Sequence, residues 1–232
     1  MDSVAGPRPA ATSTAELDRL ATHPLVQHLA RSLGERPGRE IPLPAGARAA
    51  AVLLALRARD DGEPELLMIK RADAERDPWS GHIACPGGRA EPGDADLAAT
   101  AVRETREETG VDIEHDGRVL GHLDDLSPMS PHLPPLVIRP YVALVRGDVR
   151  IVASEEVAAA FWVPLAELRT PTAWGTGVVL VRGVERTVTV FRHGAYTVWG
   201  LTERVLRQFL EYAGVAPGGE SFDDDRAPRT AR

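Results

Sequence analysis

The chain contains very little cysteine, which restricts both its covalent chemistry and its expected compartment. Cys85 is the single cysteine among 232 residues, so no disulfide can form within the chain. Proteins of oxidising compartments commonly carry disulfides, whereas cytoplasmic proteins keep their thiols reduced. We therefore expect a cytoplasmic protein in which Cys85 packs as a small apolar side chain.

The chain also lacks an excess of positive charge, a long apolar run and a secretory leader. It carries 27 Lys and Arg against 34 Asp and Glu, a formal charge of -7. Non-specific binding to nucleic acid needs a basic face, so we expect no nucleic-acid partner. No apolar run reaches the roughly 18 residues that a membrane span requires, and the N-terminus has no apolar h-region. We therefore expect neither a membrane partner nor a signal peptide.

The chain does have enough apolar sequence for one sizeable core, since 43% of its residues are hydrophobic. Residues 1–12, rich in Ala and Pro, and the polar residues 216–232 are expected to be disordered. A Ser followed three residues later by Glu forms a capping-box pattern, which predicts an N-terminal helix over residues 13–34. The segment 45–215 is expected to form the main domain.

Short apolar runs of strand length, separated by turn residues, fill most of this domain. A helix that ends at Gly110 and an amphipathic helix over residues 202–212 complete the pattern. Many short strands with few helices favour an α/β (α+β) sandwich, in which helices flank a mixed sheet. The strands are expected at residues 49–56, 66–70, 83–85, 117–123, 136–145, 158–163, 177–182 and 186–192.

The most informative stretch is residues 86–111, PGGRAEPGDADLAATAVRETREETGV. Since helical residues advance by about 100° each, Glu104, Glu107 and Glu108 fall on one face of a helix. Like charges on one face repel unless a cation lies among them. Oxygen ligands suit Mg²⁺ or Mn²⁺, and Mg²⁺ is commonly shared with substrate phosphates. The alternative is a solvated acidic face paired with neighbouring arginines.

This stretch resembles the Nudix box, the signature of metal-dependent hydrolases of nucleoside diphosphates linked to another group. Gly88 opens the pattern, and residues 103–111, RETREETGV, close it. Asp94 stands where the family has its first Glu, eight rather than seven residues separate it from Arg103, and Thr105 replaces an apolar residue. The resemblance implies an α/β/α sandwich around a mixed sheet, which agrees with the strand pattern.

The resemblance also implies roles for the residues of the box. Glu104 and Glu108 would bind the metal, and Glu107 would bind it or act as a base, while Arg103 orients a glutamate. The Gly87-Gly88 turn lets the backbone approach closely, and the carbonyl of Gly87 can act as a further metal ligand. The metal would be Mg²⁺ or Mn²⁺.

For Asp94 and for the pair Glu155 and Glu156, the sequence allows either a catalytic or a structural role. Asp94 precedes a run of helix formers, so we interpret it as a helix N-cap in preference to a metal ligand. A water-activating base often comes from a later loop in this family, and Glu155 and Glu156 are the available pair. A solvated loop is an equally good interpretation of these two glutamates.

The residues before the box resemble the coenzyme A pyrophosphatase branch of the family. The stretch LLMIKRADAERDPWSGHIACPGG places Arg71 and Arg76 at the spacing of that signature, although Gly81 comes one residue late and Cys85 replaces a Phe. Guanidinium groups suit phosphates, so both arginines are candidates for substrate binding, as are His82 and Gly88. Solvated loop charge is the alternative for the arginines, and a structural hydrogen bond for His82.

These features together predict a hydrolase that cleaves coenzyme A or acyl-coenzyme A to 3′,5′-ADP and 4′-phosphopantetheine or its acyl form. The same chemistry on ADP-ribose, NADH or a dinucleotide is the first alternative. A non-catalytic nucleotide sensor on the same fold is the second, but such a sensor has no need to keep Arg103 and the three glutamates. The expected partner is a small nucleoside-diphosphate substrate, and the family resemblance implies a homodimer.

Overall fold

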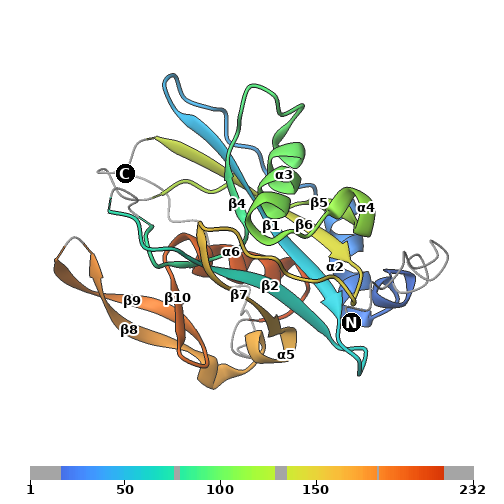
Figure 1. Ribbon diagram of the computed structural model, residues 1–232. Coiled ribbons are helices and arrows are strands. Elements are labelled where there is room, and N and C mark those ends of the chain that lie inside the picture. The colour runs from blue at the N-terminus through green and yellow to red at the C-terminus, as the bar shows by residue number, and fades with distance from the viewer. Residues whose placement is uncertain (1–16, 76–78, 129–134, 182, 217–232) are drawn as a thin grey trace, which may run out of the picture.

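The computed structural model describes residues 17–75, 79–128, 135–181 and 183–216 (Figure 1). Residues 1–12 and 217–232, within the segments expected to be disordered, lie outside the described part of the chain. In chain order, the elements are α2 (Pro24–Glu35), β1 (Arg48–Ala58), β2 (Pro64–Arg71), β3 (Ile83–Ala84), β4 (Gly87–Arg89), α3 (Leu97–Thr109), α4 (Ile113–Asp116), β5 (Gly117–His122), β6 (Leu136–Val145), β7 (Val157–Pro164), α5 (Leu165–Leu168), the 3₁₀ turn η1 (Pro171–Ala173), β8 (Trp174–Val181), β9 (Val184–His193), β10 (Tyr196–Trp199) and α6 (Leu201–Tyr212).

A seven-stranded mixed sheet forms the centre of the molecule. Its strands follow the order β3-β2-β1-β6-β5, while β4 also pairs with β1 and β7 also pairs with β2. β1 and β6 run parallel, and the other pairs of this sheet are antiparallel. A parallel pair needs a long crossover connection. Here the crossover between β1 and β6 contains α3, and so the candidate site lies within it.

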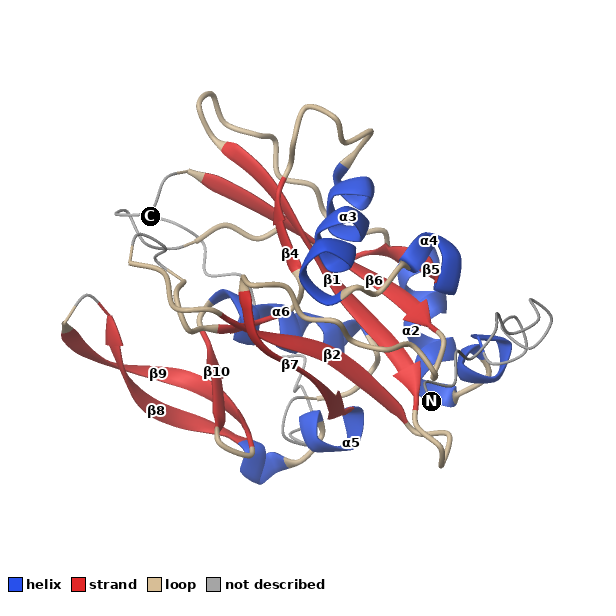
Figure 2. Ribbon diagram, viewed as in Figure 1, coloured by secondary structure: helices blue, strands red, loops and turns tan. Residues whose placement is uncertain are grey.

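Helices cover both faces of this sheet, which confirms the expected sandwich (Figure 2). Side chains alternate along β1 because successive residues of a strand point to opposite faces. Leu53 and Ala55 belong to the cluster that contains Ala101 of α3, whereas Leu54 and Leu56 belong to the cluster on the α2 and α6 side. α3 therefore packs its apolar side against one face of the sheet, and its polar side is the candidate for the functional site.

The N-terminal helix expected over residues 13–34 is interrupted. Residues 17–21 are helical, and α2 then starts at Pro24 with His23 as its N-cap. A proline inside a helix has no N–H to donate and collides with the preceding turn, so the chain bends before Pro24 and a new helix begins. α2 buries Leu25 and Leu29 in the same core cluster as α6.

All eight predicted strands are present, but the sequence patterns did not reveal two short strands and a second sheet. β4 forms within the predicted Gly-Gly turn, because Gly87 and Gly88 pair with Val52 and Ala51 of β1. β10 joins β9 and β8 in a separate three-stranded antiparallel sheet. Gly200 makes the turn into the last helix, with a φ of 69°.

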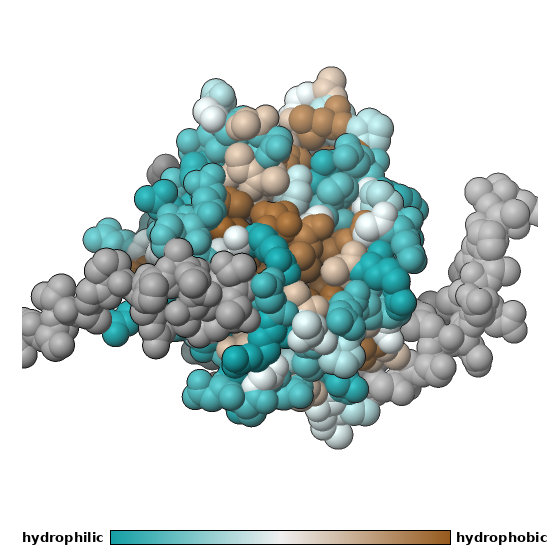
Figure 3. Space-filling model, turned by 90° about the vertical axis from the view of Figure 1, so that its right-hand side faces the viewer, coloured by the Kyte–Doolittle hydropathy of each residue, from teal (hydrophilic) through white to brown (hydrophobic). Residues whose placement is uncertain are grey.

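Within the described part of the chain, no helix combines the length and the apolar composition that crossing a membrane requires. Apolar residues do reach the surface at the centre of the face drawn in Figure 3, where polar residues surround them.

Asp124, two residues after β5, joins three segments. Its carboxylate accepts hydrogen bonds from the backbone N–H of Arg39 at 2.9 Å, from the Arg39 guanidinium at 3.0 and 3.1 Å, and from the hydroxyl of Tyr212 at 2.9 Å. Burial by itself would raise the pKa of Asp124, but the hydrogen bonds from Arg39 and Tyr212 outweigh it and lower the pKa. The charged form therefore holds the segment after α2 and the end of α6 together.

We expect Asp124→Asn to lower the free energy of unfolding at pH 7 by about 2–3 kcal/mol, because charge-assisted hydrogen bonds to a 7% exposed group are lost. Because the folded-state pKa is lowered, this contribution is present above the ordinary carboxyl pKa of 3.8 and disappears as the pH falls further. Urea unfolding at pH 7 and pH 3 measures both effects. The control Asp18→Asn, at a 61% exposed side chain, should change stability by less than about 0.5 kcal/mol.

Candidate functional site

The ends of α3 set the direction in which its glutamates point. The helix begins after Asp96, whose carboxylate accepts a hydrogen bond from the Ala99 N–H at 2.8 Å. It ends, as predicted, at Gly110, which adopts a left-handed φ of 72°. The prediction that Asp94 caps this helix is wrong, because the first helical turn forms two residues later and Asp96 takes that position.

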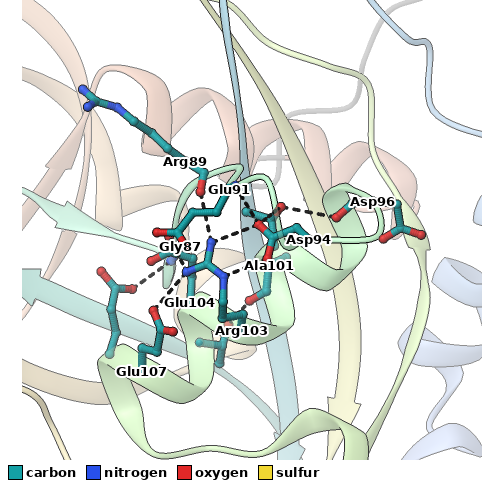
Figure 4. A network of polar contacts seen from close by, with 12 residues as sticks. Gly87, Arg89, Glu91, Asp94, Asp96, Ala101, Arg103, Glu104 and Glu107 are labelled. Carbon is teal, nitrogen blue, oxygen red and sulfur yellow. Dashed lines mark hydrogen bonds and ion pairs between the residues drawn. The ribbon is translucent and has the colours of Figure 1, made fainter.

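Asp94 instead binds the arginine of the box. Its two carboxylate oxygens accept from Nε and Nη2 of Arg103 at 2.8 and 3.0 Å, a bidentate pair (Figure 4). The Glu91 N–H and the hydroxyl of Thr100 also donate to Asp94, at 2.9 and 2.8 Å. The Arg103 guanidinium, with these other donors, holds the pKa of Asp94 well below its usual range. Asp94 is therefore a permanent anion that fixes Arg103.

Arg103 connects this loop to the glutamates of α3. Its Nη1 donates to Glu104 at 3.1 Å and to Glu107 at 3.0 Å, and its Nη2 donates to the carbonyl of Arg89 at 3.1 Å (Figure 4). One guanidinium thus contacts three carboxylates and one backbone oxygen. A planar group with five donors suits this arrangement better than a lysine would.

Glu104 lies directly over the Gly-Gly turn. A Cβ atom at Gly88 would stand 2.4 Å from the Glu104 carboxylate carbon, closer than any real contact. Burial raises the pKa of Glu104, the neighbouring charges of Glu107 and Glu156 raise it further, and the contact with Arg103 opposes both effects. Only glycine at position 88 leaves room for this carboxylate.

Glu108 is the most buried of the three glutamates, with 3% of its surface exposed. Its carboxylate accepts from the Gly87 N–H at 2.8 Å and lies 3.5 Å from Nη1 of Arg71. Burial raises the pKa of Glu108 to about 7, and the charges of Glu104 and Glu156 add to the rise, although Gly87 and Arg71 oppose it. Burial is therefore the main cause of the rise, and Gly87 and Arg71 compensate only part of it.

Glu156 adds a fourth carboxylate, whose charge acts on Glu104 and Glu108. The segment before it runs along the end of α3, where Val152 and Ser154 donate backbone hydrogen bonds to the carbonyls of Thr109 and Glu108. Glu156 itself is exposed and raises the pKa values of both Glu104 and Glu108. Of the two loop candidates, Glu156 therefore lies close enough to act on the box, and Glu155 is an exposed neighbour.

The remaining candidate residues from the sequence differ in how the structure places them. Arg71, at the end of β2, contacts Glu108 as well as having further interactions, so it does not lie free in solvent. His82 accepts a backbone hydrogen bond from Arg71 at 3.0 Å, and its ring lies 4.5 Å from that of Trp199. Arg76 lies outside the described residues. Gly87 meets Glu108 through its N–H, whereas its predicted role used its carbonyl.

The donor chemistry fits a hard divalent cation, although the described part of the chain holds no group of three His, Cys, Asp or Glu side chains already arranged around a metal position. Glu107 is turned to Arg103, and Glu108 to Gly87 and Arg71. The fit rests on charge: only oxygen donors are present, and burial, together with the neighbouring carboxylates, raises the pKa values of two of them, Glu104 and Glu108. A divalent cation would stabilise their charged forms.

Thr105 shows how a departure from the family pattern is accommodated. It is fully buried where an apolar residue is expected, and its hydroxyl donates to the carbonyl of Ala101 at 2.7 Å. A threonine in a helix can satisfy its hydroxyl in this way without a tertiary partner. The substitution therefore leaves no unpaired polar group beneath the glutamates.

Comparison with known proteins places the chain in a family. The sequence model of the NUDIX domain matches residues 47–182. Proteins of Yersinia pestis and Yersinia pseudotuberculosis, each named "Uncharacterized Nudix hydrolase NudL", are 32% identical over 171 residues, which cover 72% of this chain and 81% of theirs. The crystal structure of a MutT/nudix family protein from Enterococcus faecalis aligns over 90% of this chain and 76% of its own, with a TM-score of 0.50 and 18% identity, a likeness of fold.

We expect the stability of the metal-free protein to fall as the pH rises from about 4.5 to about 7. A carboxyl whose pKa is raised on folding stabilises the folded state below its unfolded value of 4.5, and this contribution is lost on passing the folded value of about 7. The full effect is about 3 kcal/mol. Urea unfolding in EDTA across this range measures it, and Mg²⁺ or Mn²⁺ at pH 8 should restore stability.

Glu108→Gln should remove this pH dependence and raise the stability of the metal-free protein at pH 8, because the buried charge is gone. Glu114→Gln, at an exposed position, should keep the parent slope. Parallel curves for the parent and Glu108→Gln would show that Glu108 does not carry the effect.

Proposed function

The chain belongs to the NUDIX family and is a pyrophosphohydrolase of nucleoside-diphosphate derivatives, and we propose that its substrate is coenzyme A or an acyl derivative of it. The products would be 3′,5′-ADP and 4′-phosphopantetheine or its acyl form. The observation that carries the hydrolase chemistry is the packing of Glu104 and Glu108 against the Gly87-Gly88 turn, with Glu156 near enough to raise the pKa values of both. The choice of substrate is supported by the residues before the box.

Two features support coenzyme A. The stretch from Leu66 to Gly88 is similar in spacing to the coenzyme A pyrophosphatase signature, with Arg71 at the place of its first arginine. Arg71 is also within 3.5 Å of Glu108, so a guanidinium lies next to the carboxylates that would organise the diphosphate. Coenzyme A carries a 3′-phosphate besides its diphosphate, and guanidinium groups bind phosphates in a bidentate manner.

The metal would be Mg²⁺ or Mn²⁺, and Glu104, Glu107 and Glu108, with the carbonyl of Gly87, are the groups that would hold it. When bound, it would neutralise the diphosphate and lower the pKa of water. The chain's own groups supply the remaining functions. Asp94 holds Arg103, and Arg103 in turn restricts Glu104 and Glu107. This order reduces the reorganisation that catalysis requires.

Glu156 is suited to accept the proton of the attacking water. In the reaction, the water oxygen adds to one phosphorus, the bond between that phosphorus and the bridging oxygen breaks, and the bridging oxygen leaves with the other phosphate. An exposed carboxylate near Glu104 and Glu108 is accessible to solvent water and can release the proton to solvent after each turnover. We therefore assign the base to Glu156, with Glu155 as its solvated neighbour.

Coenzyme A should be cleaved about 10- to 100-fold faster than dephospho-coenzyme A, measured as kcat/KM, because a charge-assisted phosphate contact contributes about 1.5–3 kcal/mol. Arg76→Ala should lose this preference and keep cleavage of the shared diphosphate. EDTA should abolish both reactions. Products are resolved by chromatography. Equal rates on both compounds would argue against a 3′-phosphate contact, and cleavage of ADP-ribose alone would move the substrate to the alternative class.

Gly88→Ala should lower kcat by at least about tenfold, because the new Cβ would displace the Glu104 carboxylate, which stands 2.4 Å from it. Gly93→Ala is the matched control, since nothing lies within 4 Å of a Cβ there. Steady-state assays with Mg²⁺ and with Mn²⁺ test the pair, and circular dichroism checks folding. A fully active Gly88→Ala enzyme would place the reacting centre away from this turn.

A further inference from the structure

Ring-bearing side chains gather at the corner where β3 begins, although the chain has only four tryptophans. The ring of Trp199, the last residue of β10, lies 4.5 Å from the ring of His82, the residue before β3. Trp79 begins the turn that His82 ends, because the His82 N–H donates to the carbonyl of Trp79 at 3.1 Å and Gly81 adopts a φ of 71°. Two distant parts of the chain thus bring three such residues to one corner.

This corner adjoins the carboxylate site. The N–H of Arg71 donates to the carbonyl of His82 at 3.0 Å, and the guanidinium of Arg71 lies 3.5 Å from Glu108. The next N–H, that of Ala72, donates to the carbonyl of Glu156 at 2.8 Å. In a nucleoside diphosphate only a ribose separates the base from the first phosphate. A surface for the base is therefore expected beside the groups that meet the diphosphate, which is where this corner lies.

The attachment of the second sheet does not depend on the contact between Trp199 and His82. Val198 is 1% exposed in the core, and Tyr196 stacks on Phe161 of β7 with ring centroids 4.3 Å apart and planes 10° apart. Trp199 and His82 are by contrast partly exposed, and their planes differ by 50°. Rings tilted in this way do not cover each other's faces, so an apolar aromatic surface stays available to a ligand.

Trp199 is held in place by the elements on either side of it. β10 is the strand of the second sheet that lies against β3 (Figure 2). Gly200 follows with a φ of 69° and a ψ of -130°, and α6 begins at Leu201. The backbone of Trp199 is thus fixed before a ligand arrives, which reduces the entropy lost on binding. Because the NUDIX match ends at residue 182, β10 adds this ring to the family's domain from outside it.

We propose that Trp199 and His82 form the surface on which the nucleobase of the substrate stacks. Stacking on an aromatic ring does not require a charge on the base, so the neighbouring carboxylates do not oppose it. The proposal rests on the proposed function, since hydrolysis of a nucleoside-diphosphate derivative brings the base to this corner. It applies equally to coenzyme A, ADP-ribose and NADH, because all three carry adenine. Trp199 is therefore a determinant of specificity for the base.

Binding of AMP and of ribose 5-phosphate to the full chain with Mg²⁺, measured by calorimetry, tests the proposal, because the two ligands differ only in the adenine. The parent should bind AMP at least about tenfold more tightly. Trp199→Leu should reduce this ratio to less than about twofold, while Trp199→Phe, which keeps a ring, should retain most of it. His82→Leu should lower the ratio as well. Circular dichroism checks the folding of each variant.

Trp174→Phe is the matched control. Trp174 belongs to the same sheet, but its Nε1 donates to the carbonyl of Leu168 at 2.8 Å and its ring packs on Phe191, so the control should keep the parent ratio. A parent ratio near one, an unchanged ratio in Trp199→Leu, or a ratio lost only in Trp174→Phe would overturn the proposal.

A separate assay distinguishes this proposal from the proposed function. Hydrolysis of coenzyme A and ADP-ribose with Mg²⁺ is measured on the same parent protein. A parent that binds AMP through Trp199 and cleaves neither compound would contradict the proposed function and support the base surface. A parent that cleaves them with no preference for AMP over ribose 5-phosphate would support the function and overturn the base surface.

Discussion

Excess negative charge at the Gly87-Gly88 turn is the constraint on which the rest of the site depends. Glu104 and Glu108 are packed against the backbone of β4, and Glu156 adds its charge from a later loop. Arg103, Arg71 and the N–H of Gly87 each offset part of this charge, yet the pKa of Glu108 still rises to about 7. A divalent cation would supply the missing positive charge and would in turn attract the negatively charged diphosphate, so the same charge imbalance fits both the cofactor and the substrate class.

The two departures from the Nudix box offset each other. Asp94 is one methylene shorter than the expected glutamate, and the loop between it and Arg103 is one residue longer. The longer loop brings the shorter side chain within 2.8 and 3.0 Å of the guanidinium, where it makes a bidentate pair. The bidentate geometry of this ion pair determines how firmly Arg103 is held. Thr105, a further departure, is accommodated because its hydroxyl is satisfied within α3.

The topology of the mixed sheet places the carboxylates of α3 beside β4. The parallel pair of β1 and β6 requires a crossover, and α3 lies in that crossover with its apolar side on the sheet and its carboxylates beside β4. The second sheet, β10-β9-β8, is separate from the seven-stranded sheet, and its edge strand β8 carries an exposed valine and an exposed leucine.

The sequence alone determined the elements whose signals are local. Alternation and length predicted the strands, helical spacing placed three glutamates on one face, and Gly110 ended α3 because only a left-handed residue suits that position. Tertiary structure decided what depends on contacts distant in the chain. It made Asp96 the helix cap and Asp94 the partner of Arg103. It brought Glu156 near Glu108, which lies 48 positions earlier in the chain, and it made strands of residues 87–89 and 196–199. No local pattern encodes these outcomes, since a strand of three or four residues forms only where a neighbouring strand offers its backbone, and a carboxylate's pKa depends on every charge that folding brings near it.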